Sequence, residues 1–419
     1  MRRYFGTDGV RGVVGEDLTV ELVEKLGKAA TLWSGGGRVF VGRDTRGSGP
    51  ELEEAFARGV VAAGGSAVLA GVLPTPAVAL LALDLGIVIS ASHNPPEYNG
   101  VKLFDAEGRK LTDAAEEEIE SLLEADGPGG GRIDRVDVAN ESYLEHVVER
   151  FGSGLHGLRI VVDCANGAYS GIAPKAFSRL GADVTAIADE PDGTNINVGC
   201  GATDLGLLSR TVVEHGADLG IAFDGDGDRV LAVDAAGETV DGDQILAILA
   251  LHLDVELVAV TQMTNLGFHR LMEEHGIRVV TTAVGDRYVL EALRAEGGLL
   301  GGEQSGHVIY LRDHVTGDGL AAALLLCGAL DGRSLAEAAA VMLKYPQAKE
   351  NVRTRTKSLP DDLLAEIEVI NRELDGTGRV FVRPSGTEPL VRVLVEAPGE
   401  QEARRLCGKI SALVSRELG

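Results

Sequence analysis

The chain has 419 residues, of which 45% are hydrophobic, 25% charged and only 4% aromatic. This length is too great for one ordinary core, and it predicts roughly three or four domains of a water-soluble globular protein. The formal net charge of −25 argues against nucleic acid or an anionic membrane surface as the main partner, because like charges repel. An anionic ligand would need a local basic cluster.

Cysteine use and the N-terminal sequence both favour a cytoplasmic protein. The four cysteines are far apart and form no CxxC pair, so neither a zinc site nor a disulfide framework is indicated. The opening MRRYFGTDGVRG has glycine and aspartate where a signal peptide needs an apolar core. The most apolar region, residues 68–91, is interrupted by Pro74, Pro76 and Asp84, which excludes a membrane span. We expect a monomer or a homodimer.

Three stretches of the chain repeat one α/β pattern, in which a short β-branched strand is followed by a helix, a glycine and a second strand. The first strands of the repeats are RVFVG (38–42), LRIVVD (158–163) and ELVAVT (256–261). Helices are expected from Pro50, Ser170 and Asn265. Each repeat then continues through a second helix to a last apolar strand, which ends in GIVISAS, ADLGIAF and GLLGG respectively. The pattern predicts three related α/β domains.

The segment from about Glu350 has a different pattern. RVFVRPSGTEPLVRVLVEA reads as two strands joined by a polar loop, and a helix is expected over residues 400–418. This segment predicts a smaller α+β domain. The four predicted domains span residues 1–150, 151–253, 254–347 and 348–419.

Polar loops follow the last strand of each repeat: SHNP in the first, DGDGDR in the second and EQSGH in the third. Ligands of open parallel sheets bind beyond the carboxyl ends of the strands. Three equivalent loops are therefore expected to face one shared cleft.

The DGDGDR loop places Asp224, Asp226 and Asp228 at alternate positions. Alternate residues of an extended chain point the same way, so the three carboxylates can converge on a hard cation such as Mg²⁺. An EF-hand loop begins with the same spacing, but it needs glycine where Arg229 stands and glutamate where Ala235 stands. A solvated acidic turn is the remaining alternative.

The RPSGTEP loop gathers Arg383, Ser385 and Thr387 around Gly386, and Arg392 follows on the next strand. A guanidinium, hydroxyls and backbone N–H groups together make a phosphate cradle. The alternative is an ordinary β-turn with surface polar residues.

Three further loops carry candidate ligand contacts. FGTDGVRG supplies Arg11 for a phosphate, and NGVK supplies Lys102. GEQSGH supplies Glu303 and Ser305 for sugar hydroxyls and His307 for acid-base chemistry or a phosphate contact. Plain structural loops, a solvated lysine and a capped turn are the alternatives.

Ser92 and His93 come at the end of the first apolar run. A Ser-His pair of an acyl hydrolase is one interpretation, but adjacent residues of an extended segment point to opposite sides, and no G-x-S-x-G elbow surrounds Ser92. A serine that carries a phosphoryl group beside a cation held by the aspartates is the second. The third is a strand end with two polar residues.

Four motifs together resemble one family. SASHNPPEYNGVK, DGDGDR, GEQSGH and RPSGTEP, in this order and spread over the whole chain, resemble the four signatures of the α-D-phosphohexomutases. FGTDGVRG, VGDRYVLEAL (284–293) and the glutamine of GEQSGH are similar to the bacterial branch that acts on glucosamine phosphates. The resemblance implies three related α/β domains with mixed sheets and a smaller C-terminal α+β domain, arranged in a heart shape around a central cleft.

The resemblance also implies roles for individual residues. The phosphoserine is Ser92, which joins three aspartates as a ligand of one Mg²⁺ ion: Asp224, Asp226 and Asp228. The other residues implied near the reacting centre are Lys102, His307, Arg11 and His93. The residues implied in substrate binding are Glu303, Ser305, Arg229, Asp286, Arg287, Arg383, Ser385, Gly386, Thr387 and Arg392.

The implied activity is that of an intramolecular phosphotransferase. Phospho-Ser92 would pass its phosphoryl group to O1 of glucosamine 6-phosphate, and the resulting 1,6-bisphosphate, which is both intermediate and activator, would turn and leave as glucosamine 1-phosphate. The product would feed the synthesis of UDP-N-acetylglucosamine and cell-wall precursors. The sequence PPEY at residues 95–98 is also common in the glucose and mannose branches, so a phosphoglucomutase/phosphomannomutase is the alternative. A non-catalytic sugar-phosphate sensor and a Mg²⁺-dependent phosphatase are alternatives of other classes.

Overall fold

The computed structural model describes residues 3–6, 8–356, 358–385 and 390–419, and it divides the chain into two compact units. The first unit comprises Met1–Met263 and Ile277–Val341, and the second comprises Thr264–Gly276 and Met342–Gly419. Among the residues described, no helix combines the length and the apolar character that crossing a bilayer requires.

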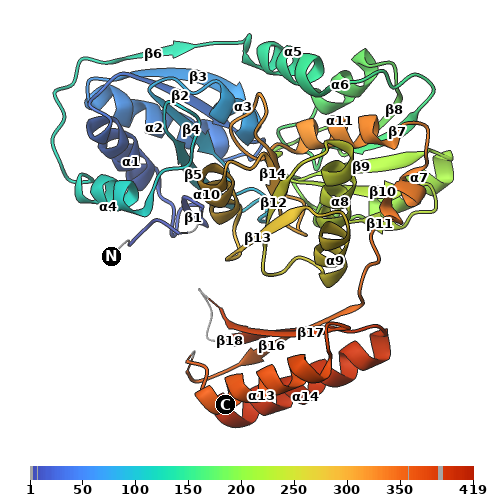
Figure 1. The fold of residues 1–419 in the computed structure, drawn as a ribbon. Coiled ribbons are helices and arrows are strands. Elements are labelled where there is room, and N and C mark those ends of the chain that lie inside the picture. The colour runs from blue at the N-terminus through green and yellow to red at the C-terminus, as the bar shows by residue number, and fades with distance from the viewer. Residues whose placement is uncertain (1–2, 7, 357, 386–389) are drawn as a thin grey trace. The chain divides into compact units, whose positions relative to one another are not determined.

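The first sheet of the first unit has six strands in the order β1-β5-β4-β2-β3-β6 (Figure 1). β2, β3, β4 and β6 run parallel, whereas β5 pairs antiparallel with β4 and with β1. The strands are β1 (Val10–Val13), β2 (Arg38–Arg43), β3 (Ser66–Val72), β4 (Leu85–Ile89), β5 (Tyr98–Phe104) and β6 (Arg132–Arg135). The helices of this part of the chain are α1 (Val20–Trp33), α2 (Gly49–Ala62), α3 (Thr75–Leu80), α4 (Asp113–Ser121) and α5 (Ala139–Phe151).

Close packing of α1 on α2 depends on glycine. A Cβ on Gly27 would lie 2.3 Å from the carbonyl oxygen of Phe56, and one on Gly59 would lie 2.0 Å from that of Glu24. Only glycine permits this approach. The helices cover a sheet whose central strand β4 is buried at every position, as expected of a parallel strand covered on both faces.

The second sheet has the order β11-β10-β9-β7-β8, and β10 runs antiparallel to β9. Its strands are β7 (Arg159–Asp163), β8 (Asp183–Ile187), β9 (Leu219–Phe223), β10 (Val230–Asp234) and β11 (Thr239–Val240). The helices along this stretch are α6 (Ala173–Arg179), α7 (Gly206–His215) and α8 (Gly242–His252). Asp241 begins α8 with a capping box that it forms with Gln244.

The third sheet has the order β13-β12-β14-β15, and only β15 is antiparallel. Its strands are β12 (Leu257–Thr261), β13 (Arg278–Thr282), β14 (Leu300–Gly302) and β15 (Val308–Tyr310). The helices that follow β13 within the first unit are α10 (Asp286–Glu296), α11 (Gly319–Leu330) and α12 (Leu335–Ala339).

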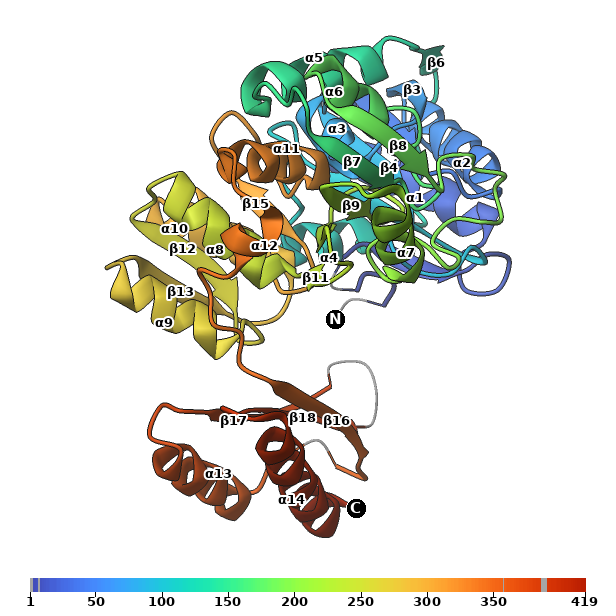
Figure 2. The ribbon, with the colours of Figure 1, turned by 90° about the vertical axis from the view of Figure 1, so that its right-hand side faces the viewer.

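The second unit contains a three-stranded antiparallel sheet in the order β16-β18-β17, with α13 (Asp361–Glu373) and α14 (Glu400–Leu418) against one face (Figure 2). Its elements are α9 (Leu266–Glu274), β16 (Gln347–Arg353), α13 (Asp361–Glu373), β17 (Arg379–Pro384), β18 (Leu390–Glu396) and α14 (Glu400–Leu418). Alternate residues of β18, including Val391, Val393 and Val395, pack with α13 and α14 into one core.

Most of the expected elements form where the sequence pattern places them. The helix expected over residues 400–418 is α14, and α9 begins after its N-cap Asn265 as expected. Two boundaries were wrong. The helix expected from Ser170 begins at Ala173, and the first repeat's last strand ends at Ile89 instead of continuing to Ser92.

Candidate active site

Ser92 lies in the loop that joins β4 to β5, residues 90–97, which we call the Ser92 loop. Its side chain is buried, and its φ of +52° is in the left-handed region, a conformation that costs a non-glycine residue about 1–3 kcal/mol. The expectation that Ser92 and His93 point to opposite sides of an extended segment was therefore wrong. Ser92 Oγ lies 3.3 Å from His93 Nδ1 and donates a 2.6 Å hydrogen bond to Asp224 Oδ2.

Asp224, Asp226 and Asp228 converge as the sequence spacing predicted. All three are buried, and one carboxylate oxygen of each lies within 4.8 Å of the others. The backbone turns between them, with a φ of +80° at Gly227, so the convergence depends on a glycine turn and not on an extended chain. A Cβ at Gly227 would lie 2.4 Å from the ring of Tyr169, so the turn is packed tightly from behind.

The aspartate cluster fits a bound cation on the chemistry of its own residues. Asp226 Oδ1 is buried and has no hydrogen-bond partner. Burial, followed by the charges of Asp228 and Asp226, raises the pKa of Asp224 to about 7. A buried orphan oxygen and mutual repulsion are both relieved by a cation, and carboxylate oxygens are the ligands that Mg²⁺ prefers.

Lys102 is one of the positively charged side chains that contact this cluster. It lies on β5 and is buried, and its Nζ donates to Asp226 Oδ2 at 2.7 Å and to Asp228 Oδ2 at 3.1 Å. It also lies 3.1 Å from Asp8 Oδ2. Burial lowers the pKa of Lys102, but the three carboxylates outweigh burial and hold it well above its usual value.

His307 links the third sheet to the same cluster. Its Nε2 lies 3.0 Å from Asp228 Oδ1, and its Nδ1 lies 2.9 Å from Glu303 Oε2. Burial lowers the pKa of His307, yet Asp228 together with the hydrogen bonds raises it to about 10, so the ring is an imidazolium here. Glu303 also accepts from the backbone N–H of Gly285 at 3.0 Å. Ser305, which was expected to bind the sugar, is exposed in the same loop.

Two arginines lie close enough to His93 to affect its charge. Burial, followed by the positive charges of Arg229 and Arg11, lowers the pKa of His93 to about 4. Arg11 pairs with Asp8, and both Arg11 Nε and Arg229 Nε are buried without a hydrogen-bond partner. Guanidinium groups with unused donors beside a neutral histidine favour an anion at this position.

Asp286 and Arg287 take part in ion pairs outside the Ser92 loop. Lys110 Nζ lies 2.7 Å from Asp286 Oδ2 and 2.7 Å from Asp8 Oδ1, so Asp286 reaches the cluster only through other side chains. Arg287 lies 2.8 Å from Asp113. Sequence analysis missed Asp8, the carboxylate that pairs with Lys102, Lys110 and Arg11. It lies within the FGTDGVRG loop that supplied Arg11.

The predicted phosphate loop lies in the second unit, and the structure describes part of it. Arg383 on β17 pairs in register with Arg392 on β18. Burial and the charge of Arg392 lower the pKa of Arg383. Ser385 is buried at the end of β17, whereas Gly386 and Thr387 lie outside the described residues. Two guanidinium groups on opposing strands favour an anionic ligand.

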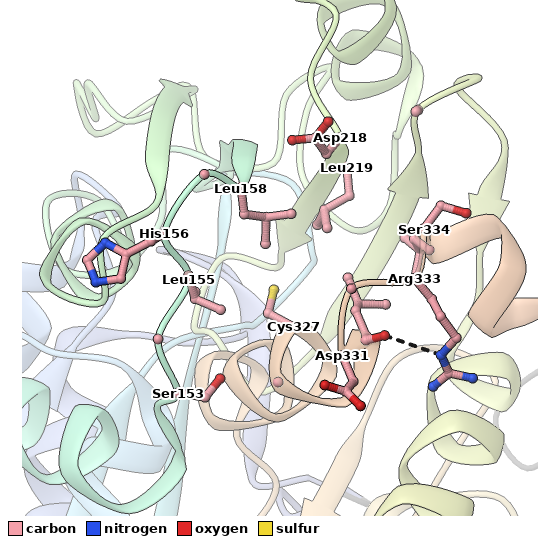
Figure 3. Close-up of a pocket in the computed structure, with 17 residues that line it drawn as sticks. Ser153, Leu155, His156, Leu158, Asp218, Leu219, Cys327, Asp331, Arg333 and Ser334 are labelled. Atoms are coloured by element: carbon pink, nitrogen blue, oxygen red, sulfur yellow. Dashed lines mark hydrogen bonds between the residues drawn. The ribbon is translucent and has the colours of Figure 1, made fainter.

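A separate pocket of about 640 Å³ lies elsewhere in the first unit (Figure 3). Its apolar floor includes Leu155, Leu158 and Cys327, while Arg333 at its rim donates to the carbonyl of Leu330. None of the residues that line it belongs to the Ser92 loop or the aspartate cluster.

Comparisons with known proteins cover all parts of the chain. Phosphoglucomutase/phosphomannomutase α/β/α domains I, II and III match residues 2–128, 141–237 and 241–345, and the C-terminal domain of that family matches residues 343–413. The phosphoglucosamine mutase of Saccharopolyspora erythraea is 50% identical, over 99% of each chain. That of Streptomyces griseus is 48% identical, over 100% of each.

A solved structure shows the same fold. A phosphoglucomutase/phosphomannomutase family protein from Burkholderia thailandensis superposes with a TM-score of 0.84 at 25% identity, covering 98% of this chain and 97% of that one. The chain belongs to the phosphoglucomutase/phosphomannomutase family, the α-D-phosphohexomutases. The resemblance found in the four motifs and the expected α/β fold class are thereby confirmed.

Proposed function

We propose that the protein interconverts glucosamine 6-phosphate and glucosamine 1-phosphate, as a phosphoglucosamine mutase. The observation that carries the chemistry is the buried Ser92 hydroxyl, which lies 2.6 Å from Asp224 within a cluster of three aspartates. The choice of sugar is supported by relatives named phosphoglucosamine mutase that are 48–50% identical over nearly the whole chain.

In the first half of the proposed reaction, Ser92 carries a phosphoryl group. The bond between its phosphorus and Ser92 Oγ breaks and a new bond to O1 of glucosamine 6-phosphate forms. The O1 hydroxyl gives up its proton to the site, and the site supplies one proton to the departing Ser92 Oγ. The product is glucosamine 1,6-bisphosphate. In the second half, the bisphosphate has turned, the bond between O6 and its phosphorus breaks, and the phosphoryl group returns to Ser92 Oγ. The Ser92 hydroxyl gives its proton to the site and O6 gains one, which releases glucosamine 1-phosphate.

The charged side chains around Ser92 suit both halves. We assign the proton movements to Lys102 and His307, which each hold a proton against carboxylates of the cluster: the proton held there is donated to the departing oxygen, and the attacking hydroxyl replaces it. Arg11 and Arg229 carry guanidinium charge that would neutralise the oxygens of the transferring phosphoryl group. Glu303, held by His307 and by the Gly285 N–H, can accept hydrogen bonds from sugar hydroxyls.

The aspartate cluster is proposed to hold one Mg²⁺ ion, with Asp224, Asp226 and Asp228 as ligands and Ser92 as the fourth. When bound, the ion supplies positive charge that stabilises the transferring phosphoryl group. Because Lys102 shares Asp226 and Asp228 with that position, occupancy would weaken the hold of these two carboxylates on its proton.

The phosphate that is not reacting is proposed to bind the β17–β18 loop, through Arg383, Ser385, Gly386, Thr387 and Arg392. Asp286 and Arg287 are proposed to support substrate binding from the start of α10. We infer a cytoplasmic role in supplying UDP-N-acetylglucosamine and cell-wall precursors, with four domains divided near residues 150, 253 and 347.

The experiment that tests the proposal measures both the phosphoserine and the sugar. Intact-mass and peptide mass spectrometry should find one phosphate on Ser92 after incubation with a hexose 1,6-bisphosphate. ³¹P NMR should then show glucosamine 6-phosphate converted to the 1-phosphate faster than glucose or mannose 6-phosphate. Absence of phosphate on Ser92 would contradict the mechanism, and stoichiometric release of inorganic phosphate would indicate a phosphatase.

A phosphoglucomutase/phosphomannomutase is the second candidate. It is supported by the PPEY spelling in the Ser92 loop, which is also common in those branches. Equal or faster turnover of glucose or mannose 6-phosphate in the same experiment would favour it over the first proposal.

A further inference from the structure

Arg46 is fully buried, and its guanidinium group holds the backbone of the Ser92 loop. Its Nη2 donates to the carbonyl oxygens of Ser92 at 2.9 Å and Asn94 at 2.7 Å. Its Nη1 donates to the carbonyl oxygen of Tyr98 at 2.9 Å and to that of Pro95. One side chain therefore fixes four carbonyls spread over seven residues.

A second set of contacts fixes the start of the same loop through Asp44. Asp44 Oδ2 accepts from Arg46 Nε at 2.9 Å and from Ser90 Oγ at 2.6 Å, and Ser90 Oγ in turn accepts from the Ser92 N–H at 2.9 Å. Together with the four carbonyls, Asp44 accounts for all five N–H donors of Arg46. A guanidinium used completely in this way makes a rigid anchor.

Asn197 reaches the same carbonyl groups from the second sheet's side of the unit. Its Nδ2 donates to the carbonyl oxygen of Ser92 at 3.0 Å and lies 3.4 Å from that of Asn94. The Ser92 carbonyl therefore receives two donors, one from Arg46 and one from Asn197. Gly225 permits this contact, because a Cβ there would lie 2.8 Å from both the Ser92 carbonyl oxygen and Asn197 Nδ2.

These contacts matter because Ser92 has a left-handed backbone, with a φ of +52°. Neither strand hydrogen bonds nor a glycine maintain that conformation, so the surrounding donors must. The direction of the Ser92 side chain follows from its backbone, and that direction brings Oγ to 2.6 Å from Asp224. A different backbone at Ser92 would move the nucleophile away from the aspartate cluster.

We propose that Arg46 and Asn197 are positioning residues for phosphoryl transfer, which hold the carbonyl of Ser92 so that its Oγ faces the aspartate cluster. Neither side chain donates to Ser92 Oγ or to a carboxylate of the cluster. The inference rests on the proposed phosphoserine mechanism, because it assigns a function to the orientation of Ser92. It predicts loss of the transfer step with little change in substrate affinity.

The first test compares Arg46→Lys with Arg43→Lys. Lysine keeps the charge opposite Asp44 but cannot bond four carbonyls. Arg43, at the end of β2 three residues earlier, lies 3.5 Å from Glu53, and its side chain donates to the carbonyl of Asp44 and not to the Ser92 loop. Protein loaded with phosphate on Ser92 is mixed with glucosamine 6-phosphate, and loss of that phosphate is followed by rapid-quench mass spectrometry. We expect Arg46→Lys to slow the transfer roughly 10- to 100-fold, while KM changes little and Arg43→Lys transfers normally.

The second test needs no change in a fully buried charge. Asn197→Ala removes one neutral donor, and Asn197→Gly removes it without straining the φ of +59° at this position. Both should slow the same step about fivefold, whereas Asn195→Ala, in the same loop, should not. Thermal unfolding of each variant checks that the fold is kept. If Arg46→Lys does not fold, the comparison of the Asn197 variants with Asn195→Ala tests the positioning inference.

The outcomes separate this inference from the proposed function. If wild-type protein carries phosphate on Ser92 and turns over, but Asn197→Ala and a folded Arg46→Lys transfer as fast as wild type, the positioning inference is wrong and the mechanism stands. A rise in KM with unchanged transfer would overturn it as well. If wild-type Ser92 never carries phosphate, the mechanism itself fails.

Discussion

The surroundings of Ser92 combine positive and negative side chains, whereas the paired arginines of the second unit bring two like charges together. Around Ser92, carboxylates and cations alternate, and Lys102 and His307 are each held between two or more acidic groups. On β17 and β18, Arg383 and Arg392 stand opposite one another, and their repulsion contributes to the lowered pKa of Arg383. The first arrangement is organised before a substrate arrives, whereas the second brings two like charges together, which is the arrangement that the proposed phosphate contact would use.

The largest effect is expected from Ser92→Ala, which tests the preorganised region. Removing the hydroxyl should abolish turnover and leave glucosamine 6-phosphate binding measurable by calorimetry, because the hydroxyl is needed for covalent transfer and contributes little to affinity. Ser92→Gly should be equally inactive, although glycine relieves the left-handed backbone. Ser121→Ala, on the exposed side of α4, is the matched control, and normal turnover by Ser92→Ala would end the phosphoserine mechanism.

Asp226→Asn should produce the next largest effect. The change removes one charge from the aspartate cluster and weakens the pair with Lys102, so the Mg²⁺ concentration that gives half-maximal activity should rise at least tenfold, as for the loss of about 1.4 kcal/mol. Measuring activity over a range of Mg²⁺ concentrations gives this half-maximal value for both proteins. Asp234→Asn, at a buried aspartate that ends β10, should leave the requirement unchanged. An unaltered Mg²⁺ dependence in Asp226→Asn would place the cation elsewhere.

Arg383→Gln tests the second region. Loss of a charge-assisted contact to phosphate should raise KM about 10- to 100-fold with a smaller change in kcat. Arg353→Gln, on exposed β16 of the same sheet, is the control. An equal fall in kcat and kcat/KM in Arg383→Gln would mean that the contact forms only in the transition state.

The smallest effect is expected at His269, a half-buried histidine of the second unit. Burial, followed by the charge of Arg379, lowers the pKa of His269 to about 4. Because the unfolded chain binds this proton near pH 6.5 and the folded chain does not, stability should fall as pH drops from 6.5 towards 4. The wild-type Tm should therefore decrease more between pH 7 and 5 than that of His269→Gln. His215→Gln, an exposed histidine on α7, should behave as wild type.

The sequence was sufficient to predict the family and most of the elements, because repeated strands and four ordered motifs carry that information locally. The aspartate spacing also predicted a convergent cluster, although the glycine turn at Gly227 and not an extended chain produces it. His93 shows where local reasoning failed. Its position relative to Ser92 depends on a left-handed backbone that Arg46 holds from 46 residues away along the chain.

The ion pairs of Asp8 could not be predicted either, because they also join segments that are distant along the chain. Asp8, Lys102 and Lys110 come from separate segments, and only folding brings them within hydrogen-bond distance. Nothing in the local sequence around Asp8 distinguishes it from a turn residue. Long-range pairing of this kind needs the structure, whereas motifs that carry their ligands within six residues do not.

The tight fit of Tyr169 behind Gly227 has an evolutionary consequence. A methyl group at position 227 would overlap the ring, with its nearest contact at 2.4 Å, so the present position of the tyrosine ring requires glycine at 227. A lineage that acquires alanine at 227 must first accept a smaller or displaced side chain at 169. We therefore expect the residues at positions 227 and 169 to vary together among homologues.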